Sequence, residues 1–418
     1  MNVWSDSVTR RRFLWLSALA GGTLALGGCA DDEPREEAPS STTFDEEQSA
    51  SGSGANGEGG AAVEDDGAVV RARVDAMTLE QKVAQLFVVA PEALVEDVAQ
   101  VTAAGDMTHE GVTAYPVGGI VYFAQNLIDP DQTTEMLANV KHFYSEDGSV
   151  APFLAVDEEG GSVVRIADND AFGVQDVGDA SALGQAGDAA AAKAAAEKIA
   201  DYLKPLGFNL DFAPVCDVVD PTRSDTMGLR SFSGDAQVAA DMVKAEVEGF
   251  TGRGMLCCAK HFPGIGSAAG DSHEGAITID KSVEELEQAD LVPFKAAIEA
   301  GAPLIMVGHL NLPAVVGDDT PAPLSAKVVQ DLLRDTLHYE GVVITDSLAM
   351  GAITERYSSA EAVVAALAAG CDIPLMPEDF KAAYQGVLDA VADGTLTEER
   401  IDESVTRILT AKQKYIGV

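Results

Sequence analysis

The chain has 418 residues, of which 68 are Asp or Glu and 27 are Lys or Arg, so its formal net charge is −41 at pH 7. This excess of negative charge argues against nucleic acid as a partner and against direct adsorption to anionic lipid. The five cysteines contain no CxxC pair and no metal-ligand spacing, and no metal or organic cofactor is implied.

The first 28 residues have the pattern of an export signal. Three arginines at positions 10–12 precede an apolar run that ends at Gly28. This run is shorter than the roughly 20 residues that a membrane-spanning helix needs. Residues 9–14 resemble a twin-arginine signal, and residues 26–29 resemble a bacterial lipobox in which Cys29 is lipidated. The alternatives are an ordinary signal peptide and an uncleaved anchor.

Residues 29–68 are predicted to be the lipidated Cys29 followed by a disordered acidic linker. Ser, Gly, Ala, Asp and Glu dominate this segment, which leaves too little apolar surface for folding. The folded domain is expected over residues 69–418. This organisation predicts an exported protein on the outer face of the bacterial cell membrane, which contacts the membrane only through its lipid.

The remaining four cysteines lie in or beside apolar, strand-like runs. Such positions predict small buried thiols and not disulfide partners. The four are Cys216, Cys257, Cys258 and Cys371.

From residue 69 onward, apolar strand-like runs alternate with helical patterns. The expected strands are residues 83–89, 118–123, 153–157, 210–215, 255–259, 304–308, 341–345 and 372–376. The expected helices are residues 189–203, 283–300, 326–337, 360–369, 382–392 and 398–415. This alternation predicts an α/β fold with a parallel sheet covered on both sides.

For roughly 350 residues, a single closed (β/α)8 barrel of the TIM type is the natural form of such a sheet. An open doubly wound sheet is the alternative, but no GxGxxG follows the first expected strand.

Several expected strands end in residues that can carry out acid–base or ionic chemistry. In a barrel these strand ends converge on one face, where active sites lie. Five such ends are hard to explain by solvation alone. The residues are Asp157, Asp217, Lys260, His261, His309 and Asp346.

The residue types fit the chemistry of a retaining glycosidase, which needs a carboxylate nucleophile and an acid for the leaving oxygen. Asp346 follows a rigid apolar strand and suits the nucleophile. His273 lies two residues from Asp271 on a Gly-rich loop, and such a pair can act as an acid and then as a base near neutral pH. Lys260 and His261 can donate to sugar hydroxyls. An Asx turn is the structural alternative for residues 271–273.

Short motifs occur in a fixed order from about Leu79 to the end of the chain. They are DEEGG at 157–161, FAPV at 212–215, RSF at 230–232, KHFPG at 260–264, DSH at 271–273, MVGH at 306–309 and TDSL at 345–348. This set resembles glycoside hydrolase family 3 and, within it, the bacterial β-N-acetylglucosaminidases.

The resemblance implies a retaining exo-β-N-acetylglucosaminidase that releases terminal GlcNAc from peptidoglycan fragments or other glycans through a covalent glycosyl-aspartate. It implies that Asp346 is the nucleophile, His273 the acid/base and Asp271 its partner. The residues that it implies for binding the sugar ring are Asp157, Arg230, Lys260 and His261.

The same resemblance implies that β-glucosidases of the family take their catalytic acid, a Glu, from a second domain. We do not expect such a domain after Val418. We expect the protein to act on its carbohydrate substrate as a monomer.

Four positions depart from the family pattern. Ser347 replaces a frequent second acid beside Asp346, which leaves one candidate nucleophile. Glu158 replaces a frequent Gln, Ser162 a frequent Arg and Ile265 a frequent His. The loss of Arg and His near the catalytic face concerns the aglycone preference more than the reaction.

Three other functions are considered. One is a β-glucosidase of the same family. Another is a β-N-acetylglucosaminide phosphorylase, because a neutral His base would not repel phosphate as a Glu would. The third is a non-catalytic lipoprotein that binds sugars, which the presence of both Asp346 and His273 disfavours.

Overall fold

The computed structural model describes residues 66–95, 97–220, 222, 226–266 and 277–417. All of them lie in the unit that spans Ala62–Val418. The predicted signal, Cys29, and the linker up to residue 65 are outside the described residues, as are Asp271 and His273. Within the described part, no helix has both the length and the apolarity that a membrane crossing requires.

A curled, parallel, seven-stranded sheet lies at the centre of this unit, in the order β1-β2-β3-β4-β5-β7-β9. All of its strand residues are buried, which explains why the sequence gives apolar runs without polar alternation. The strands are β1 (Val88–Val89), β2 (Gly119–Tyr122), β3 (Phe153–Val156), β4 (Leu210–Asp211), β5 (Leu256–Phe262), β7 (Leu304–Val307) and β9 (Val342–Thr345).

The segment from Asp372 to Met376, predicted as the eighth strand, forms isolated parallel bridges and no strand. Ile373 bridges Ile344 of β9, and Leu375 bridges Val88 of β1. This segment therefore contacts both edge strands of the curled sheet. A separate two-stranded sheet of β6 (Ile277–Thr278) and β8 (Leu310–Asn311) was not predicted.

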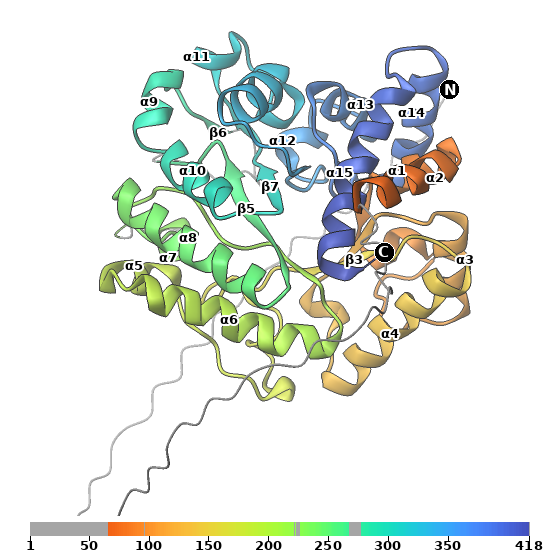
Figure 1. Cartoon of the computed structure of the whole chain (residues 1–418), viewed down its shortest axis with the longest axis horizontal. Helices are drawn as coiled ribbons and strands as arrows, with labels where there is room; N and C mark the ends of the chain where they lie inside the picture. The colour runs from red at the N-terminus through yellow and green to blue at the C-terminus, as the bar shows by residue number, and fades with distance from the viewer. Residues whose placement is uncertain (1–65, 96, 221, 223–225, 267–276, 418) are drawn as a thin grey trace, which may run out of the picture. The chain divides into compact units, whose positions relative to one another are not determined.

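Helices surround the sheet, with β3, β5 and β7 in the middle of the unit (Figure 1). Along one side α6 packs against α8, and α8 packs against α10. The α-helices of seven or more residues are α1 (Asp66–Ala76), α2 (Leu79–Gln85), α3 (Asp106–Ala114), α4 (Pro130–Glu146), α5 (Ala180–Ala186), α6 (Ala189–Leu206), α8 (Ala236–Gly252), α10 (Leu291–Glu299), α13 (Ser359–Ala369), α14 (Phe380–Ala392) and α15 (Glu398–Ile416).

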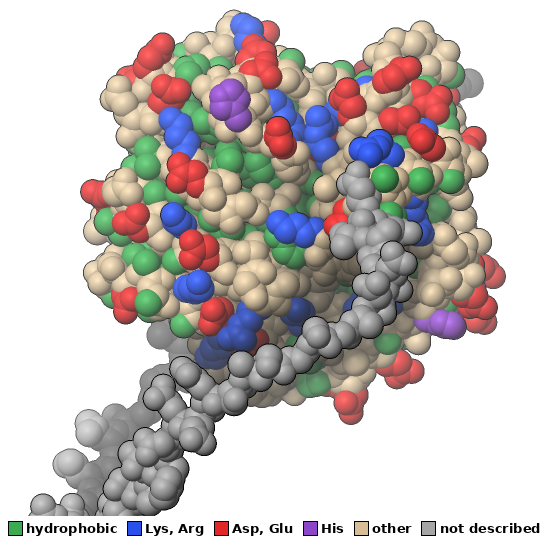
Figure 2. All heavy atoms as spheres, viewed as in Figure 1, with side chains coloured by type: hydrophobic (Ala, Val, Ile, Leu, Met, Phe, Trp, Pro, Cys, Tyr) green, Lys and Arg blue, Asp and Glu red, His purple; other side chains and the backbone are tan. Residues whose placement is uncertain are grey.

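The shorter helices are α7 (Thr226–Arg230), α9 (Val283–Gln288), α11 (Pro313–Val316) and α12 (Gly351–Thr354). The predicted helix at 326–337 is a π-helix, η5 (Lys327–Thr336). On the face shown in Figure 2, acidic side chains are spread over the surface among scattered basic ones. The four cysteines predicted as buried thiols are buried and free.

Several predicted elements were wrong in part, and the strand expected at 210–215, for example, ends at Asp211. The strand expected at 83–89 begins only at Val88, because Thr78 and Gln81 form a capping box that starts α2 and carries the helix to Gln85. The single helix expected at 283–300 is broken between α9 and α10, where the carboxylate of Asp290 accepts a 2.7 Å hydrogen bond from Lys281. In addition, α1 begins at Asp66, within the segment predicted to be linker.

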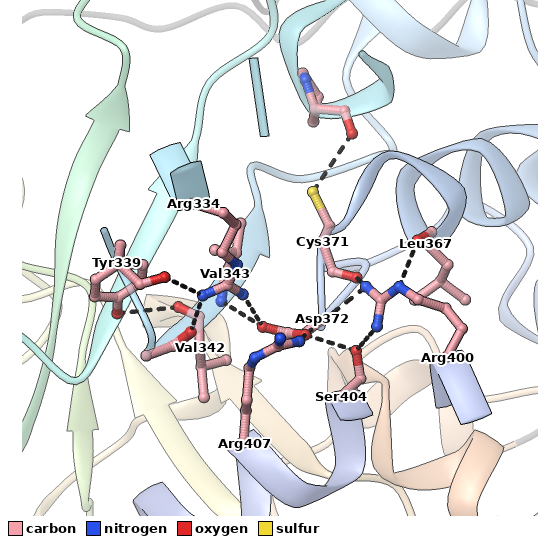
Figure 3. Close-up of polar contacts among 12 residues, drawn as sticks. Arg334, Tyr339, Val342, Val343, Leu367, Cys371, Asp372, Arg400, Ser404 and Arg407 are labelled. Carbon is pink, nitrogen blue, oxygen red and sulfur yellow. Dashed lines mark hydrogen bonds and ion pairs between the residues drawn. The ribbon is translucent and has the colours of Figure 1, made fainter. Parts of the chain in front are cut away.

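A buried ionic cluster around Asp372 fixes the start of residues 372–376, which are called the bridging segment below. The carboxylate of Asp372 accepts hydrogen bonds from Arg334 of η5 at 2.6 Å and from Arg407 of α15 at 3.0 Å. The Ser404 hydroxyl (2.6 Å) and the backbone N–H of Val343 (2.9 Å) complete its donors, and Figure 3 shows them converging on the one side chain. Asp372 thus joins the bridging segment to β9, η5 and α15.

We predict that Asp372→Asn lowers the free energy of unfolding by about 3–5 kcal/mol, because it leaves the nearly buried Arg334 and the partly exposed Arg407 without their carboxylate. Urea unfolding measures this loss. Glu378→Gln, at an exposed position on the same stretch of chain, is the matched control and is expected to change stability by less than about 0.5 kcal/mol. Equal stability of the two variants would contradict a structural role for the cluster.

Candidate active site

A cavity of about 400 Å³ opens where the parallel strands end. Its walls come from residues at or after the ends of β2, β3, β4, β5, β7 and β9, from α7 and β6, and from residues 375–376. Five of the residues predicted for catalysis or sugar binding line it: Asp157, Arg230, Lys260, His261 and Asp346. The structure therefore brings together five residues that are spread over most of the folded domain.

Asp271 and His273 lie outside the described residues, so their roles stay predictions. His309, another strand-end candidate, is buried, and its Nε2 lies 2.7 Å from the Ser347 carbonyl oxygen.

An alternating network of charges lines one part of the cavity. Lys260, which is 2% exposed, donates to Asp157 Oδ1 at 2.9 Å and to Glu159 Oε1 at 2.6 Å. Arg230 donates to both oxygens of Glu159, from Nε at 2.8 Å and from Nη2 at 2.7 Å. Arg165 adds a longer contact, 3.9 Å from Asp157 Oδ2. The network joins α7, β5 and the segment that follows β3.

The network keeps its members charged inside a largely apolar protein. Burial alone would raise the pKa of Glu159, but Arg230 and Lys260 hold it well below its usual range. Burial opposes the charge of Lys260, yet Asp157 and Glu159 raise its pKa above the ordinary value. Arg230 likewise has a raised pKa, because Glu159 more than compensates for its burial. All three are therefore ionised near neutral pH.

Asp346 directly follows β9 and is held by its backbone. Its N–H donates to the Val307 carbonyl at 2.9 Å, and its Oδ1 accepts from the Ser347 N–H at 2.7 Å. Burial would raise the pKa of Asp346, but the nearby His261 and His309 lower it below the ordinary value. An ionised, partly exposed carboxylate on a rigid strand end can act as a nucleophile.

His261 is oriented by a buried carboxylate. Its Nδ1 lies 2.8 Å from Asp217 Oδ2, and because a carboxylate can only accept, Nδ1 carries the hydrogen. The other oxygen of Asp217 accepts the Ile265 N–H at 2.7 Å. Gly308 leaves room for the base of the His261 side chain, since a Cβ at that position would lie 2.9 Å from the Cβ of His261.

The structure explains why an acid can stand at Glu158. Its fully buried carboxylate accepts the backbone N–H groups of Arg165, Ile166 and Ala167 at 2.6, 2.9 and 2.9 Å. It also accepts the Tyr202 hydroxyl at 2.9 Å. A carboxylate satisfies four donors, whereas an amide would point an NH2 group at some of them. Glu158 therefore holds the loop that carries Arg165.

Sequence reasoning gave no role to Glu159 or to Asp217. Glu159 lies two residues after Asp157 in the DEEGG motif, and Asp217 was named as a strand-end residue without a role of its own. Their partners lie far away in sequence: Arg230 is 71 residues from Glu159, and His261 is 44 residues from Asp217. The available signal for both residues was a carboxylate in or beside a motif, which could have marked them as partners of the cationic site residues.

Comparison with known proteins supplies the family. The pattern of the glycosyl hydrolase family 3 N terminal domain matches residues 78–411. The chain belongs to glycosyl hydrolase family 3. This confirms the family resemblance of the motifs, and the curled parallel sheet agrees with the barrel-like domain of that family.

Two curated family members show the extent of the match. A beta-hexosaminidase A of Pseudoalteromonas piscicida is 32% identical over 329 residues, which cover 73% of this chain and 54% of that protein. A beta-N-acetylglucosaminidase/beta-glucosidase of Cellulomonas fimi is 30% identical over 362 residues, which cover 84% of this chain and 60% of that protein. The chain thus spans little more than half the length of these relatives.

A solved structure is similar over the same region. The family 3 beta-N-acetylglucosaminidase from Paenibacillus sp. str. FPU-7 is 38% identical and has a TM-score of 0.76, covering 82% of this chain and 63% of that one. As for metals, the part of the chain that the structure describes contains no group of three or more His, Cys, Asp or Glu able to hold an ion.

A buried acid on α8 gives the protein a pH-dependent stability. Glu246 is 5% exposed, and its burial, with a smaller effect of the Glu159 charge, raises its pKa to about 8. An unfolded glutamate releases its proton near pH 4.5, so between about pH 4.5 and 8 the folded state binds the extra proton. The contribution of Glu246 to stability therefore falls as the pH rises through this window.

We predict that Glu246→Gln, which cannot ionise, gains stability relative to the parent protein between pH 5 and pH 8. The difference in the free energy of unfolding between the variant and the parent protein grows by at most about 1.4 kcal/mol per pH unit, and it stays constant above pH 8. Urea unfolding of both proteins across this range measures it. A difference that stays constant from pH 5 to pH 8 would show that Glu246 does not hold a proton when folded.

Proposed function

We propose that this protein is a retaining exo-β-N-acetylglucosaminidase that removes terminal GlcNAc from glycans. The observation that carries the proposal is an ionised carboxylate, Asp346, at a strand end in the cavity that Lys260, Arg230 and Asp157 also line. Membership of glycosyl hydrolase family 3 and the names of the beta-hexosaminidase relatives support it.

In the proposed first step, the Asp346 carboxylate attacks the anomeric carbon and the glycosidic bond breaks. His273, oriented by Asp271, gives its proton to the leaving oxygen. In the second step His273, now neutral, takes a proton from water, and the water oxygen displaces Asp346 from the anomeric carbon. The released sugar therefore has the configuration of the substrate, and no metal or organic cofactor takes part.

The proposed substrate is a neutral GlcNAc ring at the end of a peptidoglycan fragment or another glycan. Asp157 accepts hydrogen bonds from sugar hydroxyls in this proposal, and Lys260, Arg230 and His261 donate to sugar oxygens. Hydroxyls suit these groups, because each hydroxyl both donates and accepts. The relatives named as hexosaminidases support this choice of sugar.

A β-glucosidase activity is the second candidate. The Cellulomonas fimi relative carries both activities in its name. A phosphorylase is a variant of the first candidate, in which phosphate takes the place of water. A neutral His273 would favour it, because no negative charge on the base repels the incoming anion.

Two further proposals concern the whole chain. We propose that residues 372–376 act as the eighth strand of a single closed barrel, supported by their bridges to β1 and β9. We also propose that the protein is exported, lipidated at Cys29, and works as a monomer tethered to the outer face of the membrane by its acidic linker. The arginine-led apolar segment and the lipobox-like sequence support the second proposal.

We predict that Asp346→Asn lowers kcat on a chromogenic β-N-acetylglucosaminide by at least about 10³-fold, because the amide cannot form the glycosyl intermediate. Its Tm is expected to stay close to that of the parent protein, since apolar neighbours carry the strand. Ser347→Ala is the matched control at the next position and keeps most of the activity. An Asp346→Asn variant with full turnover would remove Asp346 as the nucleophile.

We predict that the chromogenic N-acetylglucosaminide is hydrolysed at least about tenfold faster than the matching glucoside, in terms of kcat/KM. Equal rates would replace the first candidate with a broad β-glycosidase. The same assay, run with and without phosphate, separates the two acceptors. Sugar 1-phosphate as the main product would make the enzyme a phosphorylase, and free GlcNAc alone would make it a hydrolase.

A further inference from the structure

We propose that Glu159 is the positioning residue of the sugar site, and that it holds Lys260 and Arg230 in place and, together with Asp157, balances their charge so that the cavity accepts a neutral ring. This proposal rests on the proposed function, because it concerns the groups that would bind the sugar. Neither the family match nor the relatives assign a role to this residue.

Three of the roughly four acceptor sites of the Glu159 carboxylate are occupied by its two partners. Oε1 accepts from Lys260 Nζ at 2.6 Å and from Arg230 Nη2 at 2.7 Å, and Oε2 accepts from Arg230 Nε at 2.8 Å. Its side chain is 5% exposed although it borders the cavity. A carboxylate occupied in this way is poorly placed to bind a sugar hydroxyl, so it acts through the two cations.

The partners, in contrast, keep donors for a ligand. Within the described part of the chain, Arg230 Nη1 lies 3.2 Å from the sulfur of Met227, a weak acceptor. Lys260 has a third N–H beyond its bonds to Glu159 and Asp157. Because Glu159 fixes both side chains by charge-assisted bonds, these remaining donors are preorganised for oxygen atoms of a ring.

The charges of the cavity balance in the described residues. Three cations line it, Lys260, Arg230 and Arg165, and each has an ion pair with a carboxylate that also lines it. The remaining lining residues are mostly apolar, and they include methionines at 227, 350 and 376. A site built from paired charges and apolar walls gives an anionic ligand no unpaired cation to bind.

Removal of the Glu159 charge should therefore change the cavity from a site for neutral ligands into a site that also binds anions. Lys260 Nζ and Arg230 Nη2 both lie within 2.7 Å of the same carboxylate oxygen. In Glu159→Gln only Asp157 compensates these two cations, and a small dianion in the cavity can accept from the donors that Lys260 and Arg230 keep for a ligand. If Glu159 had a purely structural role, its replacement would lower the stability of the protein but would not create an affinity for anions.

The test compares the parent protein, Glu159→Gln and Glu159→Asp, with Glu246→Gln as the control for loss of a second buried glutamate. On the chromogenic N-acetylglucosaminide, Glu159→Gln is expected to raise KM at least about tenfold while kcat changes by less than about threefold. Sulfate at constant ionic strength is expected to bind Glu159→Gln at least about tenfold more tightly than the parent protein, measured by titration calorimetry. Glu246→Gln is expected to match the parent protein in both assays at pH 7.

Glu159→Asp keeps the charge but shortens the side chain, so its KM is expected to rise without any gain in sulfate binding. It also serves as the test if Glu159→Gln does not fold. A KM within twofold of the parent value in either variant, or sulfate binding by Glu159→Gln no tighter than by the parent protein, would overturn the proposal. Calorimetry does not depend on turnover, so a parent protein that hydrolyses no N-acetylglucosaminide would overturn the proposed function and leave the sulfate result to decide on Glu159.

Discussion

The charge on Lys260 is the constraint on which the arrangement of the cavity depends. A lysine with 2% exposure in the middle of an apolar sheet stays ionised only if carboxylates compensate for its burial. Glu159 and Asp157 do so from the segment that follows β3, and Arg230 then balances Glu159 from α7. One buried ammonium thereby fixes the relative positions of three parts of the chain.

The bridging segment, residues 372–376, connects the cavity wall to the buried ionic cluster around Asp372. Asp372 is held by Arg334, Arg407 and Ser404, and four residues later Met376 lines the cavity. Met376 has a φ of 46°, in the left-handed region that non-glycine residues seldom adopt. Its anchored neighbours hold this strained residue in place, so packing far from the cavity contributes to the shape of its wall.

Much of the fold was predictable because its signals are local. The strand at 153–156 is an uninterrupted apolar run, and the helix at 189–206 has an Asp188 cap and ends at Gly207. The capping box of Thr78 and Gln81 is an equally local signal for the start of a helix. Because the apolar pattern alone was followed, the start of the strand predicted at 83–89 was placed inside α2. The break between Gln288 and Leu291 coincides with a bond from Lys281 to Asp290, a pairing that the local sequence pattern does not show.

The candidate site shows the same division. Strand ends converge in any parallel barrel-like sheet, so Asp157, Lys260 and Asp346 were predictable as neighbours. Glu159 and Asp217 were not assigned, because each acts on a side chain dozens of residues away and nothing in the local pattern gives that pairing. The residues that orient the site were therefore visible only in the folded chain.

The stereochemistry of the first product tests the central claim, a double displacement through Asp346, most directly. Proton NMR during the first minutes of hydrolysis, before the anomers of the sugar equilibrate, distinguishes the β-anomer of GlcNAc from the α-anomer. The account predicts that the β-anomer forms first, because two successive inversions retain the configuration. Initial appearance of the α-anomer would mean that water attacks the substrate directly, and it would contradict the assignment of Asp346 as nucleophile.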